Sequence, residues 1–428
     1  MALVMSLSFF LLLAIGTPIA FVLGSAGVLG FAVFDPSMLR LVPQRMYAAV
    51  DSFPIMAAPF FILAGELMGT SGILQRLIRF AESLVGHIRG GLAHVNIIAS
   101  MIFAGISGSA IADASALGSA LIPAMETRYK TDFAAAVCAA AATIGPIIPP
   151  SIPMVIYAYV VGRVSIGGLF LAGVVPGILM GLGMMAIVYA IARKRGYRPE
   201  AHRASVREVA TAARQAFWAM IMPLIVIGGI LGGIFTATEA AAVAVGYALL
   251  VGGFITRELK WPHVVHALSR TVTVTAVVFL LIATSNIVSW ILTISMVPAY
   301  LSAVLQSMSK SPAVFLLIVN IFLLIVGCLL DNVAAMIMIA PILAPIAAQY
   351  GIDPLHFGFV FVLNSVIGLL TPPVGAVLFV VCGISKAPIE SVAKEVLPLL
   401  LWQIAVLFLV TYVPSVALGV PHLFGYGR

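Results

Sequence analysis

Long apolar runs fill most of this sequence, and only short polar segments separate them. Most of the runs reach the roughly 20 residues that an α-helix needs to cross the hydrocarbon core of a bilayer. They cover residues 3–34, 47–69, 132–162, 167–192, 217–256, 271–294, 312–330, 355–385 and 395–418. Only 9% of the residues are charged, against about 25% in soluble domains. The sequence therefore predicts an all-α polytopic membrane protein, and it lacks the alternating short segments of a β-barrel.

The positive charge of the chain is concentrated in one polar segment. Residues 193–214 contain seven Lys or Arg and two Glu, in a chain of formal net charge +7. A basic segment between apolar runs stays in the cytoplasm, so residues 193–216 are predicted to form a cytoplasmic loop. This topology accounts for most of the excess charge, and we expect no nucleic-acid partner. Counting crossings from the loop places the N-terminus in the cytoplasm and the C-terminus on the outer side.

Two segments are predicted to enter the membrane and return to the same side. Residues 72–92 are amphipathic and resemble a helix on the cytoplasmic surface, so 94–126 must begin and end on that side. The centre of this hairpin is GISGSAIAD, residues 105–113. Irregular backbone at such depth is tolerated only where protein buries it or a wet cavity meets it. Residues 312–350 form a second predicted hairpin, which opens from the outer side.

The two hairpins belong to an internal repeat. Each copy has an aspartate followed ten residues later by a proline, and then an Ile-Gly pair followed by a double proline. The matched residues are Asp113-Pro123 with Asp331-Pro341, and Ile144-Gly145-Pro149-Pro150 with Ile367-Gly368-Pro372-Pro373. Proline removes a backbone donor and clashes one turn back, so both downstream helices are predicted to be broken. An odd number of predicted crossings between the copies inverts the second relative to the first.

This pattern predicts a scaffold and two transport repeats, because inverted repeats with broken helices near the midplane are typical of secondary transporters. The expected divisions are scaffold helices with a surface arm (1–93), a first transport repeat (94–192; hairpin 94–126, broken helix 132–162), the basic loop (193–216), scaffold helices with a second arm (217–311), a second transport repeat (312–418; hairpin 312–350, broken helix 355–385) and a tail (419–428).

The broken helices also suggest a chemistry. Freed carbonyls and nearby hydroxyls can coordinate a small hard cation, and the positive ends of half-helices can hold an anionic substrate. An intramembrane serine protease is an alternative, since GISG matches a GxSG pattern. That chemistry needs a base oriented onto the serine, and His94 lies too near the start of its own hairpin. We therefore expect no enzyme. A channel and a stand-alone ion-coupled carrier are further alternatives.

Several motifs, in order along the chain, resemble the large membrane subunit of TRAP transporters, the tripartite ATP-independent periplasmic systems. They are GISGSAIAD, TIGPIIPPS (143–151), TATEAAAVAV (236–245), LLDNVAAMIMIAPILAP (329–345) and GLLTPPVG (368–375). The resemblance implies sodium-driven, elevator-type uptake of organic acids, commonly four-carbon dicarboxylates or sialic acids, across the bacterial inner membrane, with a periplasmic C-terminus. It also implies two partners: a small four-helix membrane subunit, expected as a separate chain, and a soluble periplasmic binding protein.

The same resemblance assigns site residues. It implies one sodium site at Ser107, Gly108, Ser109, Gly145 and Pro149, and another at Asp331, Asn332, Gly368 and Thr371. Substrate is expected between the hairpin tips, at Ser107, Ser109, Asp113, Pro150, Asn332, Thr371 and Pro373. Further candidates are Thr236, Thr238 and Glu239, with a helix-start role as the alternative for Glu239. The alternative for the two serines is tight helix packing, and for the two aspartates a structural hydrogen bond. Protons are the alternative coupling ion.

Overall fold

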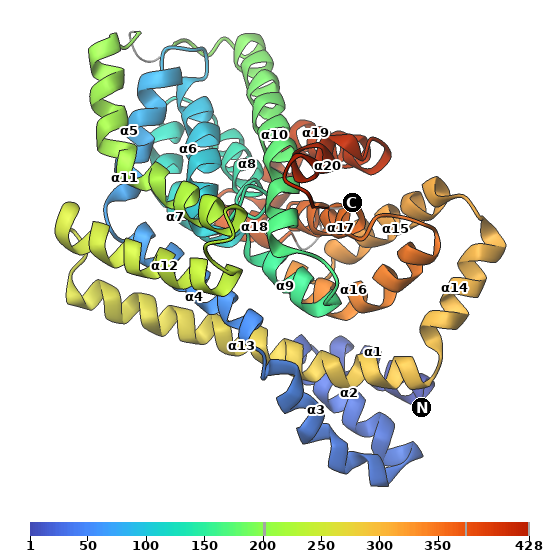
Figure 1. Cartoon of the computed structure of the whole chain (residues 1–428). Coiled ribbons are helices and arrows are strands. Elements are labelled where there is room, and N and C mark those ends of the chain that lie inside the picture. The colour runs from blue at the N-terminus through green and yellow to red at the C-terminus, as the bar shows by residue number, and fades with distance from the viewer. Residues whose placement is uncertain (200–202, 373–374, 427–428) are drawn as a thin grey trace.

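The computed structural model describes residues 1–199, 203–372 and 375–426, and the regular elements within these ranges are all helical. Among the described residues, six helices are long and apolar enough to cross a bilayer, and two bent helix pairs bring the number to eight. This architecture confirms the predicted all-α polytopic fold. Figure 1 shows the repeats packed above a long helix, α13, which extends across the lower part of the view.

The N-terminal apolar run does not cross the membrane as one helix. It forms α1 (Ala2–Ala14) and α2 (Ile19–Phe34), separated at Gly16, whose φ is +85°, and packed against each other. Helices of this length are shorter than the roughly 20 residues of a span. Met1 and Met5 lie beside Gly30, so the chain returns to the end from which it started. The prediction of one continuous crossing helix over 3–34 was therefore wrong, and the cytoplasmic N-terminus stays a prediction.

Helix α13 organises the scaffold. It runs from Trp261 to Ile294, and at 1.5 Å per residue its 34 residues extend about 50 Å. Small residues allow close approach: Gly24 and Gly27 of α2 pack against Thr284 and Ile287 of α13. The other scaffold helices are η1 (Pro36–Arg40), α3 (Leu41–Val50), η2 (Phe53–Met56), α4 (Ala57–Gly69), α11 (Val206–Leu231) and α12 (Ala237–Leu250). Of these, α3 and α4 pack directly on α13.

The two repeats have the same order of elements. The first contains α6 (Gly91–Ser107), α7 (Ala110–Glu126), α8 (Thr131–Ala142), α9 (Ile152–Val161) and α10 (Ile166–Lys194). The second contains α15 (Pro312–Gly327), α16 (Asn332–Gln349), α17 (Pro354–Gly368), α18 (Ala376–Ser385) and α19 (Ile389–Tyr412). A short helix precedes each hairpin: α5 (Ile73–Val85) in the first copy and α14 (Val297–Met308) in the second. Helix α14 meets α15 at a bend of 119°.

Each hairpin packs against the other repeat. Helix α7 of the first hairpin contacts α18, the second half of the other broken helix. Helix α16 of the second hairpin contacts α9 in the same way. These contacts join the two repeats into one packed body.

The helix starts correct the internal alignment of the repeat. Ser109 is the N-cap of α7, and Asp331 is the N-cap of α16, 222 positions later. The same spacing pairs Pro123 with Pro345, and it agrees with the spacing of 223 between Gly145 and Gly368. Asp113 therefore corresponds to Ala335 and not to Asp331. The sequence pairing of the two aspartates was wrong by four residues, about one helical turn.

Two segments, the predicted basic loop and the predicted C-terminal tail, are more helical than predicted. Helix α11 begins at Val206, because Ser205 and Glu208 form a reciprocal capping box, so the second half of the predicted loop 193–216 is helical. Near the other end, α20 (Ser415–Leu423) continues beyond the last apolar run. It packs against α10 of the first repeat.

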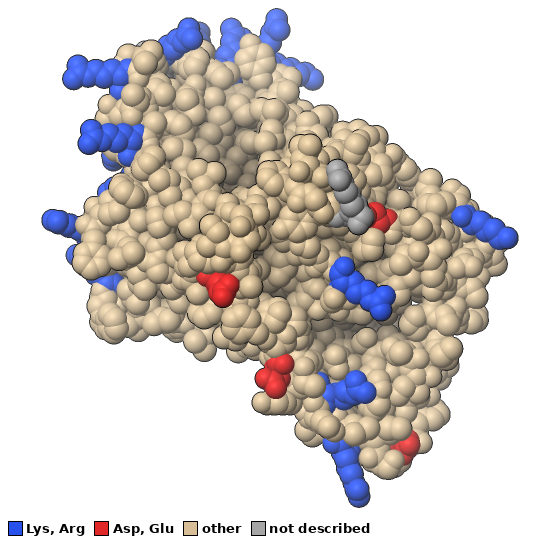
Figure 2. Space-filling view, viewed as in Figure 1, with Lys and Arg blue, Asp and Glu red and all other residues tan. Residues whose placement is uncertain are grey.

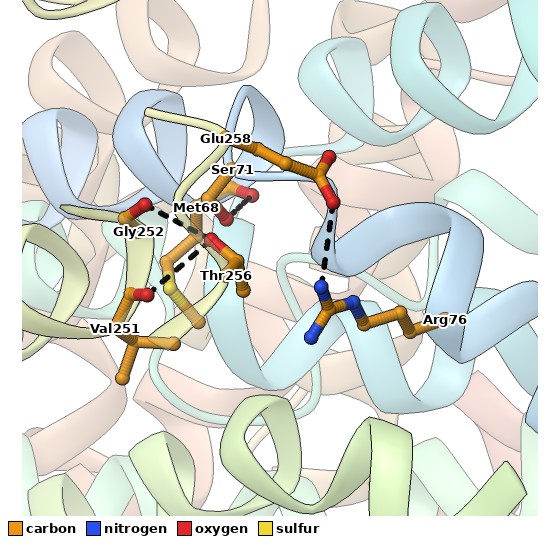
Figure 3. Close-up of polar contacts among 7 residues, drawn as sticks. All are labelled: Met68, Ser71, Arg76, Val251, Gly252, Thr256 and Glu258. Atoms are coloured by element: carbon orange, nitrogen blue, oxygen red, sulfur yellow. Dashed lines mark hydrogen bonds and ion pairs between the residues drawn. The ribbon is translucent and has the colours of Figure 1, made fainter. Parts of the chain in front are cut away.

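A tight corner joins the scaffold to the surface helix α5 (Figure 3). A π-helical turn, η3 (Val251–Ile255), ends α12, and the Thr256 hydroxyl donates to the carbonyl of Gly252 at 3.0 Å. On the other side, Arg76 of α5 forms an ion pair with Glu258 at 3.3 Å. Gly72 precedes α5 with φ of +69°, and a Cβ atom there would overlap the Glu258 carboxylate. Only glycine fits this position without strain.

We predict that Gly72→Ala lowers the melting temperature of the detergent-solubilised protein, measured by tryptophan fluorescence. A left-handed conformation costs a residue with a Cβ roughly 1–2 kcal/mol, and the new methyl group displaces Glu258. Gly69→Ala is the matched control, because a Cβ atom there meets nothing within 4 Å. Equal melting temperatures for the two variants would contradict the prediction.

Candidate functional site

One cavity lies where the two hairpin tips face the scaffold. Its volume is about 530 Å³. The first hairpin contributes residues 107–112, the second contributes residues 331–333, and α4 and α13 close the opposite side. The polar residues that line it are Glu66, Thr70, Ser107, Ser109, Ser115, Ser119, Arg270, Thr273, Asp331 and Asn332. A space of this size, with few polar groups and a largely apolar wall, is typical of a small-molecule site.

The first hairpin tip is a left-handed glycine between two serines. Gly108 has φ of +60° and turns the chain from α6 into α7. Ser109 caps α7 by accepting the N–H of Ala112 at 3.4 Å. The N–H groups of Ala110 and Ile111 belong to the first turn of α7, which has no acceptors within the helix. Both residues line the cavity, so its wall includes the positive end of a helix.

Asp113 lies directly behind this tip. It is fully buried, and its Oδ1 accepts a hydrogen bond from the hydroxyl of Ser107. No described residue donates to the other oxygen, Oδ2. Gly145, at the break between α8 and α9, is close enough that a Cβ atom there would overlap Oδ2. A buried carboxylate oxygen without a partner is costly, so this oxygen has a position that suits a cation.

The tip also rests on the first broken helix. The N–H of Ile152 donates to the carbonyl of Gly108 at 3.4 Å, and a Cβ atom on Gly108 would meet the carbonyl of Pro150. A Cβ atom on Gly105, in the last turn of α6, would lie 3.6 Å from the carbonyl oxygen of Pro149. The structure thus places the tip residues 107–109 against the break at 145–150, where the predicted first sodium site lies.

The second tip has a different cap. Asp331 accepts the N–H of Val333 at 3.0 Å and begins α16. Gly327, at the end of α15, touches Gly368 so closely that a Cβ on either would clash with the other's backbone. The hydroxyl of Thr371 donates to the carbonyl of Ile367 at 3.0 Å. The second tip therefore also meets the break in its own repeat's helix.

The residues predicted to bind substrate fall into three groups. Ser107, Ser109 and Asn332 line the cavity. Asp113 and Pro150 are buried behind the first tip, and Thr371 lies in the break after α17 without lining the cavity. The last predicted residue, Pro373, lies outside the described residues.

The segment 236–239 serves as a helix start. Glu239 accepts the N–H of Thr236 at 2.7 Å, and the hydroxyl of Thr236 accepts the N–H of Glu239 at 3.3 Å, which is a capping box at the start of α12. The hydroxyl of Thr238 donates to the carbonyl of Phe53 at 3.3 Å. These three candidates do not line the cavity, and their contacts account for the polar residues as structural groups.

The sequence prediction missed the polar groups on the scaffold side. Arg270 of α13 forms an ion pair with Glu66 of α4, with Nε and Oε1 3.1 Å apart. Thr70 and Thr273 lie beside them in the cavity wall. A signal was present: Glu66 falls inside the apolar run 47–69, and Arg270 immediately precedes the run 271–294. Ionisable residues within spans mark functional sites by default.

Solved structures of other transporters share this fold. The Alcanivorax borkumensis YdaH transporter aligns with a TM-score of 0.61 over 92% of this chain and 91% of that chain, at 14% identity. At such low identity the likeness concerns the fold alone.

Sequence comparisons are more specific. Residues 6–416 match the family model described as "Tripartite ATP-independent periplasmic transporter, DctM component". The sialic acid TRAP transporter large permease protein SiaM of Vibrio cholerae is 42% identical, over 97% of this chain and 98% of that protein. The C4-dicarboxylate TRAP transporter large permease protein DctM of Pseudomonas aeruginosa is 40% identical, over 94% of each. These matches cover nearly the whole sequence, including both hairpins, and the chain therefore belongs to the DctM-component family of large permease subunits of tripartite ATP-independent periplasmic transporters.

Proposed function

We propose that this chain carries an organic acid together with sodium into the cell across the bacterial inner membrane. A small four-helix membrane subunit stands beside it, and a periplasmic binding protein delivers the acid. Relatives of similar identity are named for sialic acid and for C4-dicarboxylates. Those acids share a carboxylate, so the proposed substrate class is a small carboxylate.

The cavity is the observation that carries this proposal. Both hairpin tips end in its wall, and the scaffold helices α4 and α13 form the opposite side. An elevator movement of the packed repeats against the scaffold would carry a molecule held there from one side of the membrane to the other. The division between repeats and scaffold at the cavity supports this mechanism.

The first tip fits a sodium ion as co-transported cargo. Hard cations prefer oxygen ligands, and the partnerless Oδ2 of Asp113 lies beside the break at Gly145. Ser107 donates its proton to Oδ1 and accepts the N–H of Ser109 at 3.3 Å, which leaves one lone pair of its oxygen to coordinate. We therefore add Asp113 to the predicted ligands and remove it from the substrate-contacting set.

The second tip offers a similar set of oxygens. Asp331 is exposed in the cavity wall, and the hydroxyl oxygen of Thr371 lies in the break that follows the end of α17 at Gly368. The contact between Gly327 and Gly368 holds the tip and the break together. These features support a second sodium site between Asp331 and the break.

The distribution of charge supports an orientation. Figure 2 shows Lys and Arg side chains crowded at the end of the molecule where α5 lies and where α10 meets α11. Arg193 and Lys194 occupy the last turn of α10 there. By the positive-inside rule this end faces the cytoplasm. The N-terminus lies at the far end, below the repeats in Figure 1, which supports a periplasmic N-terminus in place of the cytoplasmic one expected from counting crossings.

We predict sodium-dependent uptake by proteoliposomes that contain this chain and its small subunit. Labelled succinate or N-acetylneuraminate, supplied on the cognate binding protein, should accumulate under an inward sodium gradient. Replacing sodium by potassium at equal pH should abolish accumulation, because the proposal couples uptake to sodium alone. Omitting the binding protein tests the stand-alone carrier, which would still accumulate substrate. Undiminished uptake in potassium would instead indicate proton coupling.

We predict that Asp113→Asn raises the sodium concentration for half-maximal uptake about tenfold or more, equivalent to about 1.4 kcal/mol. The variant keeps the side chain's shape but removes the charge that the ion would meet. Asp132→Asn is the matched control, since Asp132 lies in the first turn of α8 and away from the cavity. An unchanged sodium dependence in Asp113→Asn would remove this residue from the ion site.

A further inference from the structure

We infer that Arg270 is the group that recognises the substrate's carboxylate, and that Glu66 is a positioning residue that orients its guanidinium. This inference rests on the proposed function, because it names the contact by which the cavity selects an acid. Both residues belong to the scaffold, and neither was part of the sites expected from the hairpins.

The charges in the cavity wall single out Arg270. Among the described residues that line the cavity, Arg270 is the one Lys or Arg, whereas Glu66 and Asp331 are carboxylates. An anion that enters this space meets more negative than positive side-chain charge. Arg270 is therefore the side chain that can offset the loss of water around a carboxylate.

The geometry of the ion pair leaves Arg270 available. The contact with Glu66 is made through Nε, at 3.1 Å. A guanidinium has five N–H donors in a planar fork, so the two terminal nitrogens remain for a second, bidentate partner. Exposure agrees with this division: the Arg270 side chain is 44% exposed, and that of Glu66 is 16% exposed.

The backbone at Glu66 is packed and hydrogen-bonded within the scaffold. The backbone carbonyl of Glu66 accepts the Thr70 hydroxyl at 3.1 Å near the end of α4, and α4 packs on α13. Thr273 occupies the cavity wall one turn after Arg270 on α13, and its hydroxyl donates to the carbonyl of Ser269 at 3.0 Å. Because the ion pair with Glu66 already orients the Arg270 side chain at Nε, that side chain loses little rotational freedom when a ligand binds its other nitrogens. This is the physical role assigned to Glu66.

A second anion-binding element lies on the hairpin side of the same cavity. The first turn of α7, at Ala110 and Ile111, lines the wall with its free N–H groups. A carboxylate on Arg270 would place the rest of a small acid towards this helix end and the Asn332 side chain. The substrate would then touch both the scaffold and the repeats, and its affinity would change when one moves past the other.

Ligand-induced thermal stabilisation of the purified complex of this chain and its small subunit tests the inference. The probes are succinate and N-acetylneuraminate in sodium chloride, with the uncharged diamide of succinate as a comparison, and the binding protein is left out. We expect the wild type to be stabilised by at least one acid, in sodium only, and not by the diamide. Arg270→Gln should lower the affinity for that acid at least tenfold. It should keep the thermal stabilisation that sodium alone produces.

Three further variants separate recognition from general damage. Arg76→Gln removes an ion pair of similar length, that with Glu258, which lies outside the cavity, and it should bind the acid like the wild type. Arg270→Lys retains the positive charge but lacks the planar pair of N–H donors of a guanidinium. Its affinity for the acid should be intermediate. Glu66→Gln should lower the affinity for the acid several-fold without changing the thermal stabilisation that sodium produces.

The outcomes distinguish two failures. If the wild type is stabilised by neither acid in sodium, the proposed function fails and this inference fails with it. If the wild type binds an acid and Arg270→Gln binds it equally well, only the assignment of Arg270 is overturned. If Arg76→Gln loses as much affinity as Arg270→Gln, the effect belongs to the scaffold's stability, and the assignment is again overturned.

Discussion

The structure depends on one constraint: a backbone polar group inside a bilayer must have a partner, because no water is there to supply one. Helices are interrupted at the two hairpin tips and at the two helix breaks, and in the described residues each tip is placed against a break. Gly108 meets the carbonyl of Pro150, and Gly327 meets Gly368. The contacts of α7 with α18 and of α16 with α9 then join the two repeats. The cavity is the space that remains in front of these paired interruptions.

Much of this architecture was visible in the sequence, because proline and glycine act locally. The double prolines at 149–150 and 372–373 mark breaks by removing donors, and a hairpin is required wherever an apolar segment must return to its own side. The run 3–34 was misjudged for a related reason. Its apolar composition is uninterrupted, and hydropathy does not distinguish one long span from two short helices that turn at Gly16 and Pro18. The alignment of Asp113 with Asp331 failed because equal spacing to a proline is satisfied equally well one helical turn away.

The site was predictable on its hairpin side and hidden on its scaffold side. Ser107, Ser109 and Asn332 fall within motifs, whereas Glu66 and Arg270 are isolated charges, 204 positions apart in the sequence. Only the packing of α4 on α13 brings them together as an ion pair in the cavity wall. Long-range pairs of this kind leave no local pattern. Their signal is energetic, since a charge within an apolar run requires a partner somewhere in the fold.

The corrected alignment of the repeats has a consequence for how the two halves have diverged. The hairpins share a backbone plan, yet the first carries its carboxylate inside the opening turn of α7, and the second carries it at the cap of α16. At the position of Asp113 the second copy has Ala335, and at the position of Asp331 the first has Ser109. The halves are thus duplicates in shape but not in electrostatics. One buries its carboxyl group and the other presents it to the cavity, so the two tips offer unlike surroundings to any group that approaches them.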